Sequence, residues 1–122
     1  SDLSLLAREL LLALKGKSRK FRQKTIEGFV RCQDSPKGSS RALGWDTPSE
    51  ESSAGKLASR TSFGHTGFTG TSIWMDPERD LYIILLSNRV HPTRKNGRIA
   101  EVRRKFSDAV LAAIDETGKK TR

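Results

Sequence analysis

Three glycines, at positions 64, 67 and 70, punctuate the stretch from Ser62 to Thr71. Two apolar runs follow it, at 73–75 and 81–86, and a segment with Pro77 between acidic residues separates them. Proline and aspartate in this arrangement are typical of a hairpin turn, so we predict adjacent antiparallel strands at 60–67, 70–76 and 80–88. Both runs are too continuously apolar for a strand with one wet face. Helices are therefore expected on both faces of the sheet.

Helical periodicity flanks this central segment on both sides. Leucines recur near the start of the chain at positions 3, 6, 10 and 14, and Gly16 supplies a C-cap. A short second helix is expected from Thr25, as its N-cap, to Val30. A longer amphipathic helix is expected at 98–116. Its predicted apolar face consists of Ile99, Val102, Phe106, Val110, Ala113 and Ile114, and the side chains predicted to point away are Glu101, Arg103, Arg104, Lys105 and Asp108.

These elements predict an α+β fold, with antiparallel sheet strands flanked by an N-terminal helix pair and a C-terminal helix. The 122 residues allow one domain at most, with a modest core. Four segments compose it: a helical segment at 1–32, a mobile loop at 33–59, the strands at 60–88 and the C-terminal helix at 98–116. Within the loop, a short strand is expected at 41–46, with Trp45 turned inward.

The chain is strongly basic, with 23 Lys and Arg residues against 14 Asp and Glu residues. Such a balance permits binding to nucleic acid, for which the segment 15–24 is the best candidate. That segment contains a single aromatic residue, Phe21, and no docking motif, so a solvated connector is favoured and nucleic acid is an unlikely partner. A small basic nucleic-acid-binding or interaction module stays open as the alternative function.

Several other classes of protein are disfavoured by residue counts. One cysteine, Cys32, excludes an internal disulfide, and two histidines offer no zinc spacing. We therefore expect no metal site. No apolar run approaches the length of a membrane span.

Two familiar phosphate-binding patterns do not fit the glycine spacing. A phosphate loop needs a lysine followed by Ser or Thr after its last glycine, and then a helix. A dinucleotide fingerprint also needs a helix at this point, where a strand is expected here. The tripeptide His65-Thr66-Gly67 fits a third pattern, the strand-borne Lys-Thr-Gly or His-Thr-Gly box of penicillin-recognising serine hydrolases.

Neighbouring residues extend this match: Leu43-Gly44-Trp45-Asp46, Phe63-Gly64, Phe68-Thr69-Gly70-Thr71 and the run from Leu85 to Pro92. Together they make the chain resemble the C-terminal part of β-lactamase-related serine hydrolases, which include class C-type β-lactamases, DD-peptidases and esterases. The resemblance implies a fragment of the β-lactamase/penicillin-binding-protein fold, and hence one partial domain. It also implies a periplasmic or other extracytoplasmic location.

The resemblance assigns roles within the box. In the family, two backbone N–H groups bind the oxyanion of the acyl-transfer intermediate, and the residue after the box supplies one of them. That role falls to the amide of Phe68, with His65 as the other catalytic candidate. Thr66 would bind a substrate carboxylate or carbonyl, and Gly67 would leave room for substrate along the strand.

Three further positions bear on the substrate. His65 stands where many members have lysine, and its weaker positive charge favours ester-like acyl substrates over β-lactams or D-alanyl carboxylates. Asn96 and Arg98 correspond to residues that contact the substrate carboxylate in class C-type relatives.

The resemblance places the nucleophile and its base in a missing N-terminal region. Ser53-Ala54-Gly55-Lys56 formally matches the Ser-x-x-Lys nucleophile motif, but Gly55 in a Ser/Gly-rich loop disfavours the helix that this motif needs. The chain is therefore expected to be a half-site of an acyl-enzyme-forming hydrolase for a small acyl substrate, inactive alone and working without a cofactor. Its partner would be the missing N-terminal part or a second copy of the chain. We expect Leu5, Leu11 and Leu12 at that contact.

Overall fold

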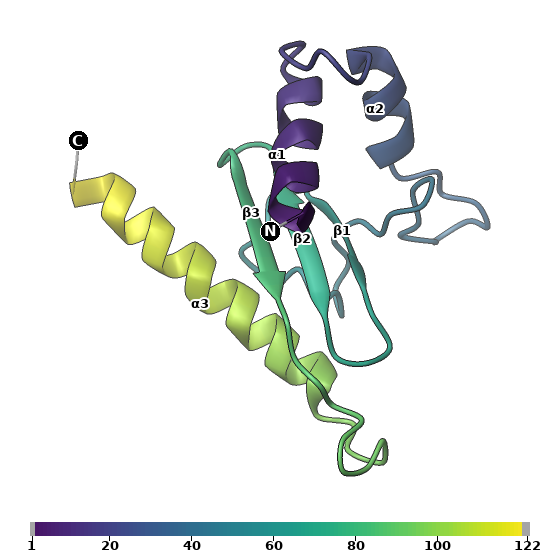
Figure 1. The fold of residues 1–122 in the computed structure, drawn as a ribbon, viewed down its shortest axis with the longest axis vertical. Helices are drawn as coiled ribbons and strands as arrows, with labels where there is room; N and C mark the ends of the chain where they lie inside the picture. Colours follow the sequence, from purple (N-terminus) through teal and green to yellow (C-terminus); the bar gives the residue numbers. More distant parts are fainter. Residues whose placement is uncertain (1, 121–122) are drawn as a thin grey trace.

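The computed structural model describes residues 2–120 and forms three helices and a three-stranded sheet (Figure 1). The helices are α1 (Asp2–Leu14), α2 (Gln23–Val30) and α3 (Ile99–Lys120), and the strands are β1 (Phe63–Thr66), β2 (Ser72–Asp76) and β3 (Leu81–Leu85). The predicted α+β fold class is confirmed, with a helix pair before the antiparallel strands and a helix after them.

The sheet is a meander in which β2 lies between β1 and β3 and pairs antiparallel with both. Its second turn is built around Asp76, whose carboxylate accepts hydrogen bonds from the amides of Glu78 and Arg79 at 3.1 and 3.3 Å. An aspartate that bonds the backbone ahead of it stabilises a turn locally. Asp80 ends the turn with a φ of 52°, a conformation that aspartate tolerates. The hairpin predicted around Pro77 is confirmed.

α1 and α2 contribute to an apolar core on one face of the sheet (Figure 1). The buried members of this core are Ala7, Leu10, Leu11, Ala13, Ile26, Phe63 and Met75. Trp45 and Phe63 form a T-shaped pair with 5.4 Å between ring centroids, so the Trp45 side chain is turned inward.

The buried side of α1 differs from the expected leucine stripe. Leu3 and Leu6 are 41% and 40% exposed, whereas Leu11 is buried. The face that meets the sheet runs through positions 7, 10, 11 and 14, which form an i, i+3, i+4, i+7 pattern. The expectation that Leu11 faces a partner is therefore wrong, and Leu5 stays exposed.

α3 covers the opposite face of the sheet and lies next to β3. Side chains alternate along a strand, so Trp74 points away from the face that carries Met75. Ser53 joins that face to α3, because its Oγ accepts a hydrogen bond from Trp74 Nε1 and its carbonyl accepts one from Ser107 Oγ, both at 3.0 Å.

The inward side of α3 is partly polar, where an apolar stripe was predicted. Three of its residues are buried: Arg103, Ser107 and Leu111. Four of the positions predicted to be apolar and inward are exposed instead: Val102, Phe106, Ala113 and Ile114. The helical period was right and its phase was wrong, because carbonyl groups of a distant loop accept hydrogen bonds from Arg103.

Two helix boundaries also differ from expectation. α2 begins at Gln23 with Arg22 as its N-cap, without a side-chain capping bond, so Thr25 is not the cap. α3 continues through Gly118 to Lys120 instead of ending near Glu116, because an exposed glycine costs a helix only about 1 kcal/mol. Among residues 2–120, no helix combines the length and the apolar character that crossing a membrane requires.

The segment at 41–46 is not a strand but two isolated bridges, Arg41 to Asp46 and Asp46 to Gly64. Gly44, with a φ of 77°, interrupts the extended backbone that a strand would need. Asp46 nevertheless exchanges two backbone hydrogen bonds with Gly64, at 2.8 and 2.9 Å. This short contact borders the outer edge of β1.

Candidate functional site

The His-Thr-Gly box lies at the end of β1, where the strand enters the loop to β2. The N–H and C=O groups of Gly64 both form hydrogen bonds with Asp46, on the side of β1 away from β2. Backbone groups of successive strand residues point to alternate sides, so those of His65 point toward β2 and those of Thr66 toward the outer edge. In the part of the chain that the structure describes, no named strand pairs with that edge. The side chains of His65 and Thr66 are exposed, and His65 Nδ1 lies 2.9 Å from Thr66 O. The box thus offers an open strand edge of the kind that binds extended ligands.

A small cavity of about 210 Å³ opens beside the box. Its lining comes from α1, from β1 and β2, and from the segments that follow β1 and β3: Leu3, His65, Thr66, Gly67, Thr71, Ser72, Ile73 and Leu86. The structure therefore brings the three box residues together at one cavity. A Cβ atom at Gly67 would collide with Thr71 Oγ1 unless the threonine side chain changed its rotamer, so glycine leaves room for this close approach.

The loop at 67–71 closes through a tight turn. Gly70 N donates to Gly67 O at 3.1 Å, and Gly67 N donates to Thr71 O at 2.8 Å. Thr69, the third residue of the turn, has no positive φ, so the turn is type I with Phe68 at its second position. Gly70 has a φ of 118°, a conformation that glycine adopts without a steric penalty.

Every backbone carbonyl of this loop accepts a hydrogen bond from another part of the chain. The donors are Arg103 Nη2 for Gly67 and Thr71, Arg89 Nε and N for Phe68 and Thr69, and Ser87 Oγ for Gly70, at 2.6 to 2.8 Å. Two guanidinium groups thus lie against the oxygen atoms of the loop.

The amides of Phe68 and Thr69 have no hydrogen-bond partner within residues 2–120. A type I turn leaves these two N–H groups free by its own geometry. Since the neighbouring carbonyls are all engaged, the unpaired backbone groups of the loop include these two N–H donors and no carbonyl. Free N–H groups at a fixed position are what a developing oxyanion needs.

Sequence reasoning missed Arg89 and Arg103. Besides its bond to the Phe68 carbonyl, the Arg89 guanidinium lies 4.4 Å from the centroid of the Phe68 ring. Arg103 is buried and its Nε has no partner, and desolvation together with repulsion from Arg89 lowers the pKa of its guanidinium. Arg103 was predicted to face solvent, because one arginine within a run of charged helix residues carries no local signal of burial.

Asn96 and Arg98 do not line the cavity beside the box. They line a separate cavity of about 470 Å³, together with Ser87, Asn88, Arg89, Ile99 and Val102. Asn96 Oδ1 accepts a hydrogen bond from the Arg98 amide at 3.0 Å, just before α3 begins. The two residues therefore share a site with each other, while Arg89 connects that site to the loop at 67–71.

Ser53 does not have the setting of a nucleophile. Residues 53–56 are not helical, and Gly55 has a φ of 88°. The Ser53 hydroxyl is a hydrogen-bond acceptor for Trp74 Nε1, and no bond from it to Lys56 is present. The helix-borne geometry of a Ser-x-x-Lys motif is thus absent at this position.

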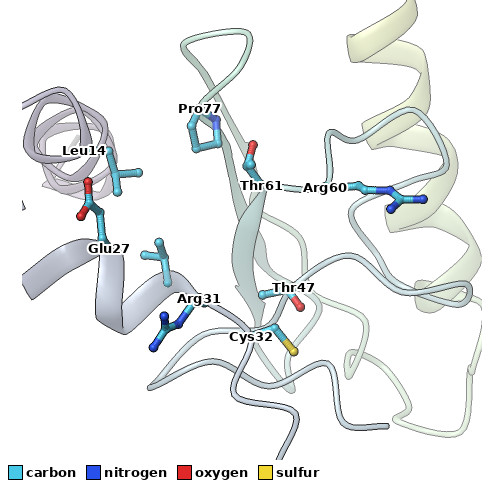
Figure 2. Close-up of a pocket in the computed structure, with 9 residues that line it drawn as sticks. Leu14, Glu27, Arg31, Cys32, Thr47, Arg60, Thr61 and Pro77 are labelled. Atoms are coloured by element: carbon cyan, nitrogen blue, oxygen red, sulfur yellow. The ribbon is translucent and has the colours of Figure 1, made fainter. Parts of the chain in front are cut away.

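A further cavity of about 460 Å³ lies at the other end of β1 (Figure 2). Leu14 and Pro77 contribute apolar walls, and Cys32, the single cysteine of the chain, is exposed at its edge. Figure 2 shows the Arg60 side chain extending away from the other labelled residues. No histidine lines this cavity, and it contains no hydrogen-bonded pair of nucleophile and base. Elsewhere in residues 2–120, no three His, Cys, Asp or Glu side chains gather closely enough to hold a metal ion.

Comparison with solved structures supports the fold. The chain superposes on a crystal structure of a beta-lactamase from Mycobacterium bovis with a TM-score of 0.72 and 23% sequence identity. The superposition covers 93% of this chain and 43% of the other.

Sequence comparison identifies the family. Two proteins that are provisionally named D-alanyl-D-alanine carboxypeptidases, from Salmonella enteritidis and Salmonella gallinarum, are each 36% identical to the chain over 87 residues. The matched region covers 69% of this chain and 20% of each relative, so the chain spans about a fifth of their length. The family model described as Beta-lactamase matches residues 2–106. The chain therefore belongs to the beta-lactamase family.

Proposed function

We propose that this chain supplies the substrate-binding strand and one oxyanion amide of a serine hydrolase that works through an acyl-enzyme. The loop at 67–71 is the observation that carries this proposal: its carbonyls are all engaged, and the amide of Phe68 is free beside the box. A free, positioned N–H group stabilises an acyl-transfer intermediate more than it stabilises the ground-state carbonyl.

The proposed reaction needs a serine nucleophile and a base from outside these 122 residues. The serine hydroxyl attacks the acyl carbonyl while the base accepts its proton, and the Phe68 N–H binds the resulting oxyanion. The intermediate then expels the leaving group, which takes the proton back from the base. Water releases the acyl group by the same two steps, and the enzyme is restored. His65 and Thr66 orient the substrate at the cavity beside the box.

The substrate class in this proposal is a small acyl compound. The names of the Salmonella relatives favour a peptide that ends in D-alanyl-D-alanine. A histidine in place of the usual lysine favours esters, so both classes belong in the assays. An extracytoplasmic location is part of the same proposal.

A chimera tests the oxyanion role of Phe68. The segment of the Salmonella enteritidis relative that aligns with this chain is replaced by the corresponding residues of this chain, and D-alanine release is measured. Phe68→Pro removes the N–H, and proline suits the second position of a type I turn. We expect a fall in kcat of about 10²- to 10³-fold, whereas Phe68→Ala keeps the amide and most of the activity. A chimera with equal kcat for both variants would contradict the proposal.

The chain alone should be inactive. We expect no hydrolysis of nitrocefin or p-nitrophenyl esters above the rate of a Ser53→Ala variant, because the hydroxyl of Ser53 lacks a base. Mass spectrometry after treatment with a fluorophosphonate or a penicillin probe gives the second readout. A covalent adduct on Ser53 would show that the nucleophile lies within this chain.

A further inference from the structure

We propose that Arg103 is a positioning residue of the His-Thr-Gly box: from α3 it fixes the peptide group whose N–H belongs to Phe68. This inference rests on the function proposed above and deepens it. The hydrogen bond from Arg103 Nη2 reaches the carbonyl of Gly67 at 2.6 Å. That carbonyl and the Phe68 N–H are the two ends of one peptide group.

The planarity of the peptide group turns this hydrogen bond into control of the amide. The C=O and the N–H of one peptide lie in a common plane and point in opposite directions. A donor that fixes the direction of the Gly67 carbonyl therefore fixes the direction of the Phe68 N–H as well. A charged donor on the oxygen also polarises the peptide and makes its N–H a stronger donor.

Arg103 holds the two ends of the loop at 67–71 together. The same Nη2 atom also donates to Thr71 O at 2.8 Å, so one guanidinium joins the residues at which the loop leaves β1 and enters β2. Arg89 performs a similar task one peptide further on, because its Nε bonds the Phe68 carbonyl, which belongs to the peptide of the free Thr69 amide. The amides of Phe68 and Thr69 therefore each belong to a peptide group whose carbonyl accepts a hydrogen bond from an arginine.

The arrangement of Arg103 is unfavourable for stability. The side chain is buried, its Nε has no partner, and no carboxylate of the described chain pairs with it. A buried charge without a counter-ion costs stability, and an apolar residue of similar volume often does better at such a site. Local violations of this kind are typical of functional sites.

Arg104 provides the matched control on the same helix. It is the next residue, it carries the same charge, and it forms an ion pair with Glu51 at 2.6 Å instead of touching the loop. A comparison of Arg103→Met with Arg104→Met therefore separates the loss of one positive charge on α3 from the loss of the bond to Gly67.

The experiment is nuclear magnetic resonance of the ¹⁵N-labelled 122-residue chain, with urea unfolding measured in parallel. In Arg103→Met we expect the Phe68 amide proton to move upfield and the order parameters of residues 68–70 to fall from about 0.85 to below about 0.6. The urea midpoint should stay level or rise, because an apolar side chain replaces a buried charge. Arg104→Met should leave the loop signals in place.

Chemical rescue supplies a second, independent readout. In Arg103→Ala, millimolar guanidinium should return the Phe68 signal toward its parent position, and equal ammonium should not. The inference is overturned if Arg103→Met leaves the loop unchanged, or if Arg104→Met loosens it equally. It is also overturned if both Arg103 variants fail to fold, since Arg103 would then serve the fold itself.

The inference and the proposed function can fail separately. Titration of the parent chain with N-acetyl-D-alanyl-D-alanine should shift the Phe68 amide signal, and Arg103→Met should weaken that shift. A loosened loop in Arg103→Met without any shift in the parent chain would support the positioning role and contradict this substrate class.

Discussion

The two long helices cover opposite faces of the same sheet and bury different chemistry. α1 buries Ala7, Leu10, Leu11 and Ala13 in an apolar core, while α3 buries Arg103 and Ser107 alongside Leu111. Both helices have clear apolar periodicity, yet only α1 turns most of its apolar residues inward. The surface that a helix packs against therefore determines which of its sides is buried. Apolar strand side chains pack against the leucines of α1, and loop carbonyls accept hydrogen bonds from Arg103 of α3.

The largest expected effect tests the apolar face. Phe63→Ala removes a fully buried ring that packs under α1 and should cost about 3–5 kcal/mol of unfolding free energy. Phe106→Ala, on the outer side of α3, where the residue is 36% exposed, is the matched control and should cost less, about 1 kcal/mol. Urea unfolding followed by far-UV circular dichroism measures both. Equal costs would mean that the outer side of α3 is not exposed in solution.

The next effect concerns Asp76, on the face of the sheet that α3 covers. Its carboxylate accepts hydrogen bonds from Ser59 Oγ at 2.6 Å and Arg79 Nη1 at 2.7 Å, and Arg79 also pairs with Asp115 of α3. Asp76→Asn should cost about 2 kcal/mol, because a charged acceptor is lost from a buried network. Asp80→Asn, at an exposed end of the same turn, should cost about 0.5 kcal/mol or less.

Asp76 also predicts how stability depends on pH. Burial opposes its ionisation, but hydrogen bonds from Ser59 and Arg79 outweigh burial and lower its pKa below the ordinary value. The contribution is therefore complete above about pH 4 and is lost as pH falls through the lowered pKa. Urea midpoints between pH 7 and pH 2 should fall less steeply in Asp76→Asn than in the parent chain. Parallel curves would remove Asp76 as the cause.

A third effect concerns association. We expect the chain to self-associate, because Leu5 on α1 and the outer residues Val102, Phe106 and Ile114 on α3 expose apolar surface. Replacing Val102 and Phe106 by serine should weaken association by about tenfold, or about 1.4 kcal/mol. Leu5→Ser tests the same idea on α1. Sedimentation equilibrium gives the masses, and a parent chain that is monomeric at micromolar concentration would contradict the expectation.

The smallest effect compares the two tryptophans. Trp74→Phe removes the hydrogen bond from Nε1 to Ser53 on the polar face and should cost about 1 kcal/mol beyond the packing change. Trp45→Phe lies at the apolar face and loses no hydrogen bond within the described chain. Thermal unfolding of both variants and of Ser53→Ala measures the difference. Non-additive effects of Trp74→Phe and Ser53→Ala would confirm that the two residues are coupled.

Local signals were sufficient to predict the three helices and the three strands of the sheet. The turn around Pro77, the apolar strand runs and the 3.6-residue periods all act over a few residues, and each gave an element of the right type. The phases of α1 and α3 were wrong, because they depend on surfaces far away in the sequence. The strand expected near Trp45 was lost to the positive φ of Gly44, which a sequence pattern does not reveal.

The candidate site likewise contains residues that local sequence identified and residues that it did not. The box residues His65, Thr66 and Gly67 were identified as a motif, and they line one cavity. Asn96 and Arg98 were chosen by correspondence along a loop, and they line another. Arg89 and Arg103 could not be found from local sequence, since their partners are backbone carbonyls and carbonyl oxygens have no residue-specific signature.

The bond between Arg103 and Gly67 sets an order of events during synthesis. Its partners are 36 residues apart, and Arg103 lies in a helix that is made after all three strands. Domains form from the N-terminal side as the chain emerges, so the hairpin strands are available before α3 exists. A ribosome stalled ahead of Arg103 would carry all three strands and an unfinished box. The box is therefore completed only after α3 has emerged from the ribosome.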